Sequence, residues 1–297
     1  MSERSILDGE MKAEIFSGIR ASGSGNSVVP VQLKPEDSFC FSCHRGVSCW
    51  NRCCHGADIT LTPYDILRLS RHFGIRPREA LLAYTVPAMW DKAELPVAKL
   101  KMGGDDGKGP CAFMTEEGCS IYENRPATCR YYPLGLASMK MKGDDHIGDF
   151  YFLVKEPHCR GHDEKKDLTV SAFREEQGVT DHDRVNRGWI DILMKMSSWK
   201  VMGGPWGQEP SPQTKRMFFM VSTDVDALRD FVFKTKFLDS YEVAPEAVEQ
   251  LKTDDEALLQ LGFDWMKTVL FNEKTLMLKE RVLRESIARA REEMGAS

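Results

Sequence analysis

Nine cysteines are the residues of this 297-residue chain most able to do chemistry, and all of them occur between residues 40 and 159. Five fall within one short stretch, FCFSCHRGVSCWNRCCHG at residues 39–56, where two are adjacent. The full set is Cys40, Cys43, Cys49, Cys53, Cys54, Cys111, Cys119, Cys129 and Cys159. Cysteines used merely as small hydrophobic residues would be scattered through every core. Their confinement to one part of the chain therefore predicts a shared purpose.

Closely spaced thiols predict a bound metal. A free thiol ionises near about pH 8.5, and neighbouring thiolates repel one another unless a cation offsets their charge. Zinc and iron-sulfur clusters both prefer thiolate sulfur, and both commonly take four protein ligands. We therefore predict zinc or iron as the cofactor, the latter including an iron-sulfur cluster, with all nine cysteines as candidate metal ligands.

The number of cysteines and the adjacent pair indicate more than one site. Neighbouring side chains diverge in an extended backbone, so Cys53 and Cys54 are predicted to serve two sites, or one site with more than one metal. Nine cysteines would complete two four-sulfur sites with one left over, and either Cys40 or Cys49 is the candidate for the spare. A zinc ribbon would show a second Cys-x-x-Cys pair, which the wider gaps after residue 110 do not supply. Zinc and iron both stay open.

Composition and charge favour a metal ion as the partner and a cytoplasmic location. The first twenty residues carry charges throughout, and no stretch reaches the roughly 18 uncharged apolar residues of a membrane span. Disulfide scaffolds are rare in a reducing cytoplasm, which disfavours that alternative for the cysteines. The net charge of -5 leaves no basic stripe for phosphate backbones, so neither nucleic acid nor membrane is expected as a partner.

Histidines beside the cysteines are alternative zinc ligands. With enough sulfur available, a position at the surface or behind the ligands is the preferred interpretation. The four are His44, His55, His158 and His162.

Two arginines and three tyrosines also lie close to the cysteines in sequence. Arg125 and Arg130 bracket Cys129, and they either stabilise anionic sulfur or pair with nearby glutamates. Those glutamates are Glu116, Glu117 and Glu123. The tyrosines are predicted to pack around the site and to exclude water from it. They are Tyr122, Tyr131 and Tyr132.

The elements that must position the cysteines are short. Thr62 is a candidate N-cap with Pro63 at the first helical position, and Gly74 ends that helix before Pro77 opens another. Two apolar runs around a Gly-Asp-Asp turn, in LASMKMKGDDHIGDFYFLV, predict a β-hairpin just before Cys159. From about residue 166 apolar residues recur three or four apart, which predicts helices. The last predicted helix, in EKTLMLKERVLRESIARAREEM, places Leu276, Leu283 and Ile287 on one face.

These patterns predict a mainly α fold with little β. We expect a flexible N-terminal segment at residues 1–37 and an irregular cysteine-rich metal-binding domain with short helices and a β-hairpin at 38–165. A helical C-terminal region follows at 166–297, which packs on the cysteine domain or presents it to a protein partner.

Two cysteine-containing stretches carry a resemblance to a known family. CFSCHRGVSCWNRCC, followed by TLTPYDILRLSRHFGI and then GPCAFMTEEGCSIYENRPATCRYYPLG, resembles the YkgJ family with its CxxCxxCC zinc- or iron-chelating domain, over about residues 38–165. The resemblance implies seven ligands, with Cys40 or Cys49 completing the set. The seven are Cys43, Cys53, Cys54, Cys111, Cys119, Cys129 and Cys159.

The spacing of the first cysteines departs from the short family pattern. A longer gap separates Cys43 from the paired cysteines, and Cys49 occupies it. This spacing is similar to the motif of the flagellin lysine methylases of the FliB type, which belong to the same broad family.

From the cysteine cluster, the main hypothesis is a cytoplasmic metal-binding protein with a structural or redox metal. The alternative, implied only by the second resemblance, is an S-adenosylmethionine-dependent protein lysine methylase.

Overall fold

The computed structural model describes residues 27–140, 147–202 and 209–293. It is about 51% helical and 17% strand, which confirms a mainly α fold with a few hairpins. Residues 1–26 of the predicted flexible segment and the Gly-Asp-Asp turn at 143–145 lie outside the described residues. In the described part of the chain, no helix is both long and apolar enough to cross a membrane.

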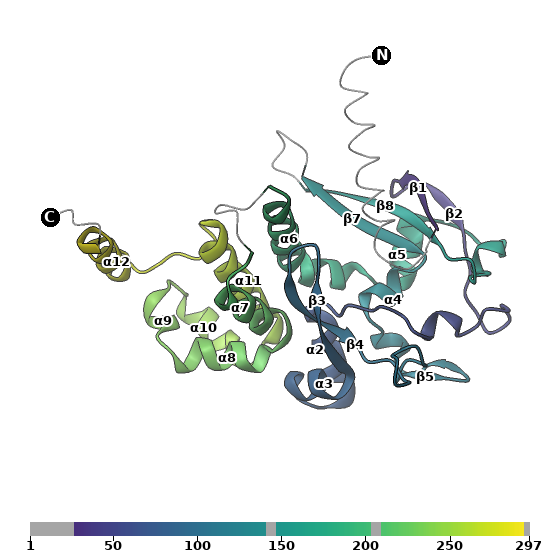
Figure 1. Ribbon diagram of the computed structural model, residues 1–297, viewed down its shortest axis with the longest axis horizontal. Coiled ribbons are helices and arrows are strands. Elements are labelled where there is room, and N and C mark those ends of the chain that lie inside the picture. The colour runs from purple at the N-terminus through teal and green to yellow at the C-terminus, as the bar shows by residue number, and fades with distance from the viewer. Residues whose placement is uncertain (1–26, 141–146, 203–208, 294–297) are drawn as a thin grey trace, which may run out of the picture. The chain divides into compact units, whose positions relative to one another are not determined.

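The described chain forms two compact units, each built from two separate segments. Residues 27–57 and 102–180 form the first, here called the cysteine unit, and residues 58–101 and 181–293 form the second, here called the helical unit. Figure 1 shows the chain leaving the first unit for α2 and α3 before it returns to β5. The division into these units reflects which residues pack together. The domain boundaries at residues 37 and 165 rest on sequence composition and stay a prediction.

A three-stranded antiparallel sheet is the largest regular part of the cysteine unit. Its order is β1 (Ser27–Leu33), β8 (Ile147–Lys155) and β7 (Leu134–Lys140), and the three lie side by side in Figure 1. The β7–β8 pairing confirms the predicted hairpin. Strand β1, however, falls within the segment predicted as a flexible lead-in. Its antiparallel partners lie 118 to 128 residues away in sequence, so no local pattern could indicate the pairing.

Short elements make up the rest of the cysteine unit. The two-stranded pairs are β2 (Ser38–Cys40) with β9 (Asp167–Thr169), and β5 (Met114–Thr115) with β6 (Gly118–Cys119). The helical pieces are η1 (Arg52–Cys54), η2 (Tyr122–Asn124), α4 (Ala127–Tyr131), η3 (Gly161–Asp163) and α5 (Val170–Gln177). Its apolar core consists of Leu33, Phe39, Phe41, Leu134, Tyr151, Val170 and Phe173.

Capping residues define the first helices of the helical unit as predicted. Helix α2 runs over Pro63–Phe73, where Thr62 accepts from the Asp65 backbone N–H and the Asp65 carboxylate accepts from the Thr62 N–H. Gly74 ends the helix with φ of 62°, a conformation in which glycine has no steric penalty. Helix α3, Pro77–Tyr84, then begins at the predicted proline.

A second hairpin, which sequence patterns did not predict, joins α3 to the rest of the helical unit. It pairs β3 (Thr85–Trp90) with β4 (Leu95–Leu100) in antiparallel register. Each strand contains a proline, Pro87 and Pro96, and proline normally argues against a strand. A two-stranded ribbon has only edge strands, so each proline can face away from the ladder.

One large apolar core lies among the helices that follow: α6 (Thr180–Met202), α7 (Pro212–Thr223), α8 (Val225–Lys234), α9 (Phe237–Ser240), α10 (Pro245–Leu251) and α11 (Asp255–Phe271). None of the described side chains of α12 (Glu280–Glu293) belongs to this core. Phe218, Phe263 and Met266 are among the fully buried side chains of this core.

The last helix differs from its prediction. It begins only at Glu280, so Leu276 lies before it, where it is buried in the core. Leu283 and Ile287 are exposed on the helix instead of sharing a face with Leu276.

Candidate metal centre

All nine cysteines lie in the cysteine unit, and all nine are described. None of them is fully buried: four are exposed and five are half-buried. A cysteine that serves as a small core residue is normally buried, so this distribution argues against that role. The exposed members are Cys40, Cys43, Cys53 and Cys129.

Backbone contacts hold the first cysteine loop against the segment around Cys159. The Ser42 N–H donates to the Gly161 carbonyl at 3.0 Å. The backbone N–H of Arg160 donates to the Cys49 Sγ at 3.1 Å. These contacts bring two segments more than 100 residues apart in sequence to the same place.

A second set of contacts holds Cys54 against the middle cysteines. The Cys111 N–H donates to the Cys54 carbonyl at 2.7 Å. The β5–β6 hairpin then folds Cys119 back opposite Met114, three residues beyond Cys111. The Phe113 N–H points at the Cys111 Sγ, 3.5 Å away.

The adjacent pair Cys53 and Cys54 lies in the 3-10 helix η1, not in the extended backbone on which their predicted divergence rested. Asn51 enters this helix with a positive φ of 64°. The side chains of Cys53 and Cys54 interact, and the resulting hydrogen bond lowers the pKa of Cys53 to about 7 while it raises that of Cys54. One thiolate next to one thiol is the arrangement that a single shared proton favours.

Electrostatic coupling defines one group of sulfurs around Cys43. Desolvation raises the pKa of the Cys43 thiol to about 11. Three nearby sulfurs add to this rise, those of Cys53, Cys49 and Cys159. The pKa of Cys159 is itself raised by desolvation, against the opposing contact of the Tyr132 hydroxyl. We call Cys43, Cys49, Cys53 and Cys159 the first thiol group.

A second group surrounds Cys54. Besides Cys53 and desolvation, the sulfurs of Cys129 and Cys111 raise the pKa of Cys54. Desolvation raises the pKa of Cys111, with a further contribution from Cys119. It also raises the pKa of Cys119, as does the Cys53 sulfur of the first thiol group, although the Ile121 N–H and the Arg125 charge oppose that shift. We call Cys54, Cys111, Cys119 and Cys129 the second thiol group.

Cys40 stands apart from both groups. It is the last residue of β2, where it lies opposite Asp167 of β9. Alternate side chains of a strand face opposite sides, and Phe39 points into the core, so Cys40 is turned outward and exposed. Between the two predicted candidates for the spare cysteine, this position favours Cys40.

Coordination geometry itself is not formed in the described chain. In these residues no three His, Cys, Asp or Glu side chains are arranged so that they could hold a metal ion as they stand. The sulfurs are near enough to raise one another's pKa, which is the signature of groups that repel when ionised. A bound cation would reverse this repulsion and lower the same pKa values, so the chemistry of the donors fits a metal.

Arg125 and Arg130 are buried and hold the loop around Cys129. Arg130 donates to the backbone carbonyls of Arg125 at 3.1 Å and Gln177 at 2.7 Å. Arg125 donates to the Tyr122 carbonyl at 2.6 Å and to the Gln177 side chain at 2.5 Å. These bonds end on carbonyl oxygens of the backbone and of the Gln177 side chain, so they shape the loop. Arg125 nevertheless lowers the thiol pKa in both groups through its charge.

The three tyrosines differ in burial. Tyr131 and Tyr132 pack at the edge of the apolar core of the cysteine unit, as predicted. Burial raises the pKa of Tyr132, and its contact with Cys159 adds to the rise. Tyr122 is 53% exposed, and the Arg125 guanidinium lies 3.8 Å from the centre of its ring.

The histidines near the cysteines have protein partners. His44 contacts Glu164 at 3.4 Å, and His158 contacts Glu156 at 3.3 Å. His162 contacts the Val154 carbonyl at 3.1 Å, and burial lowers its pKa. His55 lies 3.3 Å from the carbonyl of Asn51. These contacts favour positions outside the metal ligands.

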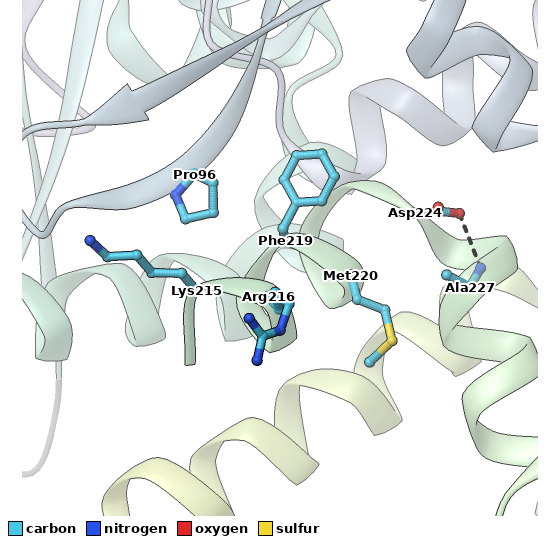
Figure 2. Close-up of a pocket in the computed structure, with 7 residues that line it drawn as sticks. All are labelled: Pro96, Lys215, Arg216, Phe219, Met220, Asp224 and Ala227. Carbon is cyan, nitrogen blue, oxygen red and sulfur yellow. Dashed lines mark hydrogen bonds between the residues drawn. The ribbon is translucent and has the colours of Figure 1, made fainter. Parts of the chain in front are cut away.

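Cavities occur in both units. In the cysteine unit, Arg52 and Arg160 border a cavity that includes Cys49. Sequence patterns did not single out these two arginines, although Arg52 directly precedes Cys53 and Arg160 directly follows Cys159. In the helical unit, a cavity of about 320 Å³ lies over β4, α7 and α8, with Phe219 and Met220 in its wall (Figure 2). It contains none of the nine cysteines.

Comparison with protein families supports the predicted domain type. Residues 42–178 match the family model described as "CxxCxxCC: Putative zinc- or iron-chelating domain". The match confirms the predicted CxxCxxCC domain, with limits at residues 42–178 in place of about 38–165, so that Cys40 lies outside it. Comparisons with curated proteins and with solved structures gave no significant match. The likeness to the FliB methylases is not confirmed and stays a prediction.

Proposed function

We propose, from the premise that residues 42–178 form a CxxCxxCC zinc- or iron-chelating domain, that the cysteine unit binds metal at both thiol groups. The first thiol group would hold one metal centre and the second thiol group another, with Cys40 outside both. When bound, zinc or iron would supply the positive charge that keeps four neighbouring sulfurs deprotonated.

One observation carries this proposal: each thiol group gathers sulfurs from distant parts of the chain through backbone contacts. The Arg160 N–H to Cys49 Sγ bond joins the two parts of the first group. The Cys111 N–H to Cys54 carbonyl bond joins the two parts of the second. Sulfurs brought together in this way repel when ionised, and a chain that merely needed small residues would have no reason to assemble them.

The apolar core of the cysteine unit supports a structural role for the metal. It is small, and the segments that carry the cysteines add only single buried apolar side chains, such as Val47, Phe113 and Ile121. Segments with so few buried apolar side chains gain from another source of stability, and structural zinc supplies about 10–16 kcal/mol of apparent binding energy in small domains. We propose that metal binding folds these loops.

A redox role would follow if the metal is an iron-sulfur cluster. Hydrogen bonds from backbone N–H groups to the ligating sulfurs tune the potential of such clusters. Bonds of this kind reach Cys49 from Arg160, Cys111 from Phe113, Cys119 from Ile121 and Cys159 from Gly161.

The identity of the metal is tested on protein purified without oxygen. Iron, zinc and sulfide are measured together with the visible spectrum. Broad absorption near about 400 nm with matching iron and sulfide indicates clusters, whereas a colourless sample with about two zinc ions per chain indicates thiolate zinc sites. A protein that carries neither metal, and takes up neither on anaerobic reconstitution, contradicts the proposal.

The division into two groups is tested by matched cysteine variants. Cys159→Ser should remove the metal of the first thiol group, and Cys111→Ser that of the second, so each should lose about half of the metal. Cys40→Ser is the control and should keep all of it. Equal metal content in all three variants would show that the grouping is wrong.

A further inference from the structure

A cavity of about 330 Å³ adjoins the first thiol group. It opens between the turn at residues 48–52 and the segment at 157–160, both in the cysteine unit. Its size lies at the lower end of the range for small-molecule sites. The residues that line it are Ser48, Cys49, Arg52, Pro157, His158 and Arg160.

Hydrogen bonds fix both walls of this cavity. The Arg52 N–H donates to the Cys49 carbonyl at 3.0 Å, which closes one turn. On the other side, the Cys159 N–H donates to the Glu156 carbonyl at 3.0 Å. The Arg160 N–H to Cys49 Sγ bond, 3.1 Å long, joins the two walls. The lining side chains are therefore presented by a held backbone.

The charged side chains that line the cavity are basic. Within the described residues, the Arg52 guanidinium has no hydrogen bond or ion pair with the protein. Arg160 is only loosely paired, with its guanidinium 3.8 Å from the Asp163 carboxylate and 59% of its side chain exposed. Neither Asp163 nor Glu156, the partner of His158, lines the cavity. Two guanidinium groups thus have donors to offer to a ligand.

Guanidinium donors select oxyanions. Their planar fork matches the oxygens of a carboxylate or a phosphate, and such bonds are about twice as strong as neutral ones. The Ser48 hydroxyl in the same wall can serve as a further donor. A neutral ligand would accept weaker hydrogen bonds and leave the two positive charges without a counter-charge, and a cationic ligand would be repelled.

We propose that this cavity binds a small anion with carboxylate or phosphate oxygens, held between Arg52 and Arg160 against the Cys49 edge of the first thiol group. The binding of the anion rests on the cavity and its two arginines alone. Its position beside a metal rests on the function proposed above. An anion there would lie next to the sulfur that joins the two halves of the first thiol group.

Calorimetric titration of the full-length protein, with its metal content as isolated, tests the proposal. The probes are inorganic phosphate and succinate, which distinguish a phosphate from a carboxylate site. Arg52→Gln and Arg160→Gln should each weaken binding of the preferred probe about tenfold or more, the loss expected for one charge-assisted bond. Arg160→Gln keeps the backbone N–H to Cys49, so it reports on the side chain alone.

Arg45→Gln is the matched control. Arg45 carries the same charge on the same segment but pairs with Glu117 and does not line the cavity, so its affinity should equal that of the unmodified chain. The absence of saturable binding of both probes at about ten millimolar, or an equal loss in all three variants, overturns the proposal. Metal content measured in parallel separates the two proposals: a protein that binds phosphate but no metal would contradict only the chelating function.

Discussion

The two units of this protein carry their stability in different places. The helical unit has a continuous core in which Phe218, Phe263 and Met266 are almost completely removed from water. The cysteine unit has a small core beside its sheet, and its nine thiols lie in loops and short elements, where none is fully buried. The helical unit is thus stabilised by apolar burial. The cysteine unit instead contains neighbouring sulfurs that repel one another when ionised, and a bound cation can stabilise them.

Metal removal should give the largest difference in behaviour between the two units. Metal-free protein prepared anaerobically should lose hydrogen-exchange protection at residues 40–57 and 102–130, because structural metal contributes about 10–16 kcal/mol in small domains. Helix α11 should keep its protection, since its core contains no sulfur ligand. Reloading with zinc or iron should restore the hydrogen-exchange protection of these residues. Identical exchange with and without metal would mean that the cysteine unit is held by its apolar core after all.

A mutation that creates a cavity in the core of the helical unit should destabilise that unit without changing the metal content. Phe263→Ala removes a side chain that is 1% exposed and packs against Gly188 of α6, and we expect a loss of about 3–5 kcal/mol in the free energy of unfolding. Urea unfolding measures the change. Metal content should stay that of the unmodified chain. The control is Val269→Ala on the same helix, 49% exposed, with an expected change within about 0.5 kcal/mol.

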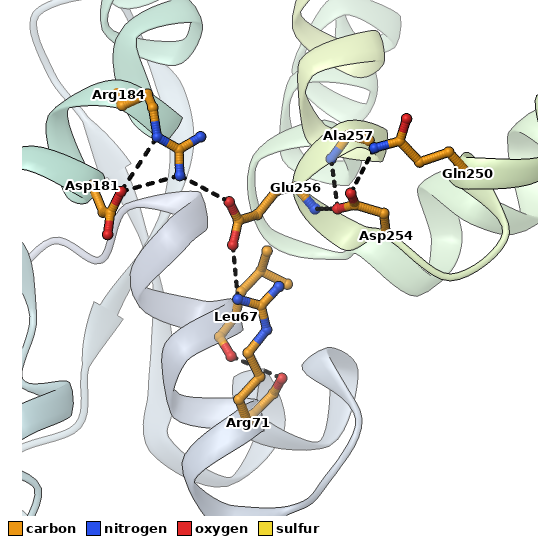
Figure 3. A network of polar contacts seen from close by, with 9 residues as sticks. Leu67, Arg71, Asp181, Arg184, Gln250, Asp254, Glu256 and Ala257 are labelled. Atoms are coloured by element: carbon orange, nitrogen blue, oxygen red, sulfur yellow. Dashed lines mark hydrogen bonds and ion pairs between the residues drawn. The ribbon is translucent and has the colours of Figure 1, made fainter. Parts of the chain in front are cut away.

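The cap of α11 should give a smaller, pH-dependent effect. The Asp254 carboxylate accepts from the backbone N–H groups of Ala257 and Glu256 and from the Gln250 side chain (Figure 3). These bonds lower its pKa. A lowered pKa in the folded state contributes stability above the unfolded value near about 3.9, and this contribution is lost as pH falls through the folded value.

Asp254→Ala should therefore cost about 1 kcal/mol at neutral pH, and the difference from the unmodified chain should narrow below about pH 4. Hydrogen exchange of the α11 amides, at neutral pH and below about pH 4, measures this difference in stability. Asp254→Asn keeps an acceptor, so it should retain most of the stability at neutral pH but lose the pH dependence. A difference that grows as the pH falls would contradict this assignment of the cap.

The smallest effect is expected from the ion pairs beside that cap. Arg184 contacts both Asp181 and Glu256 at 3.2 Å, and Arg71 contacts Glu256 at 2.8 Å (Figure 3). Arg184 is 61% exposed, so Arg184→Ala should cost only about 0.2–1 kcal/mol, and less at high salt. A double-mutant cycle with Glu256→Ala measures the coupling energy between Arg184 and Glu256. A coupling as large as the Phe263→Ala effect would show that charge, not apolar burial, holds the helical unit.

The sequence alone predicted those features that depend on neighbouring residues. The limits of α2 followed from Thr62 and Gly74, because a cap and a positive φ are local requirements. The β7–β8 hairpin followed from two apolar runs around a turn. The types of the candidate ligands, and their confinement to the front half of the chain, were also readable, since thiolate chemistry belongs to the residue itself.

Tertiary structure decided everything that joins distant segments. Strand β1 exists because β8 offers it a partner, and residues 58–101 pack in the helical unit although cysteines flank them on both sides. The division of the sulfurs into two groups, the outward turn of Cys40, and the cavity between Arg52 and Arg160 likewise depend on contacts between residues more than 50 positions apart. Sequence spacing carries no record of such contacts, because loop closure lets the chain return from almost any distance at a similar entropic cost.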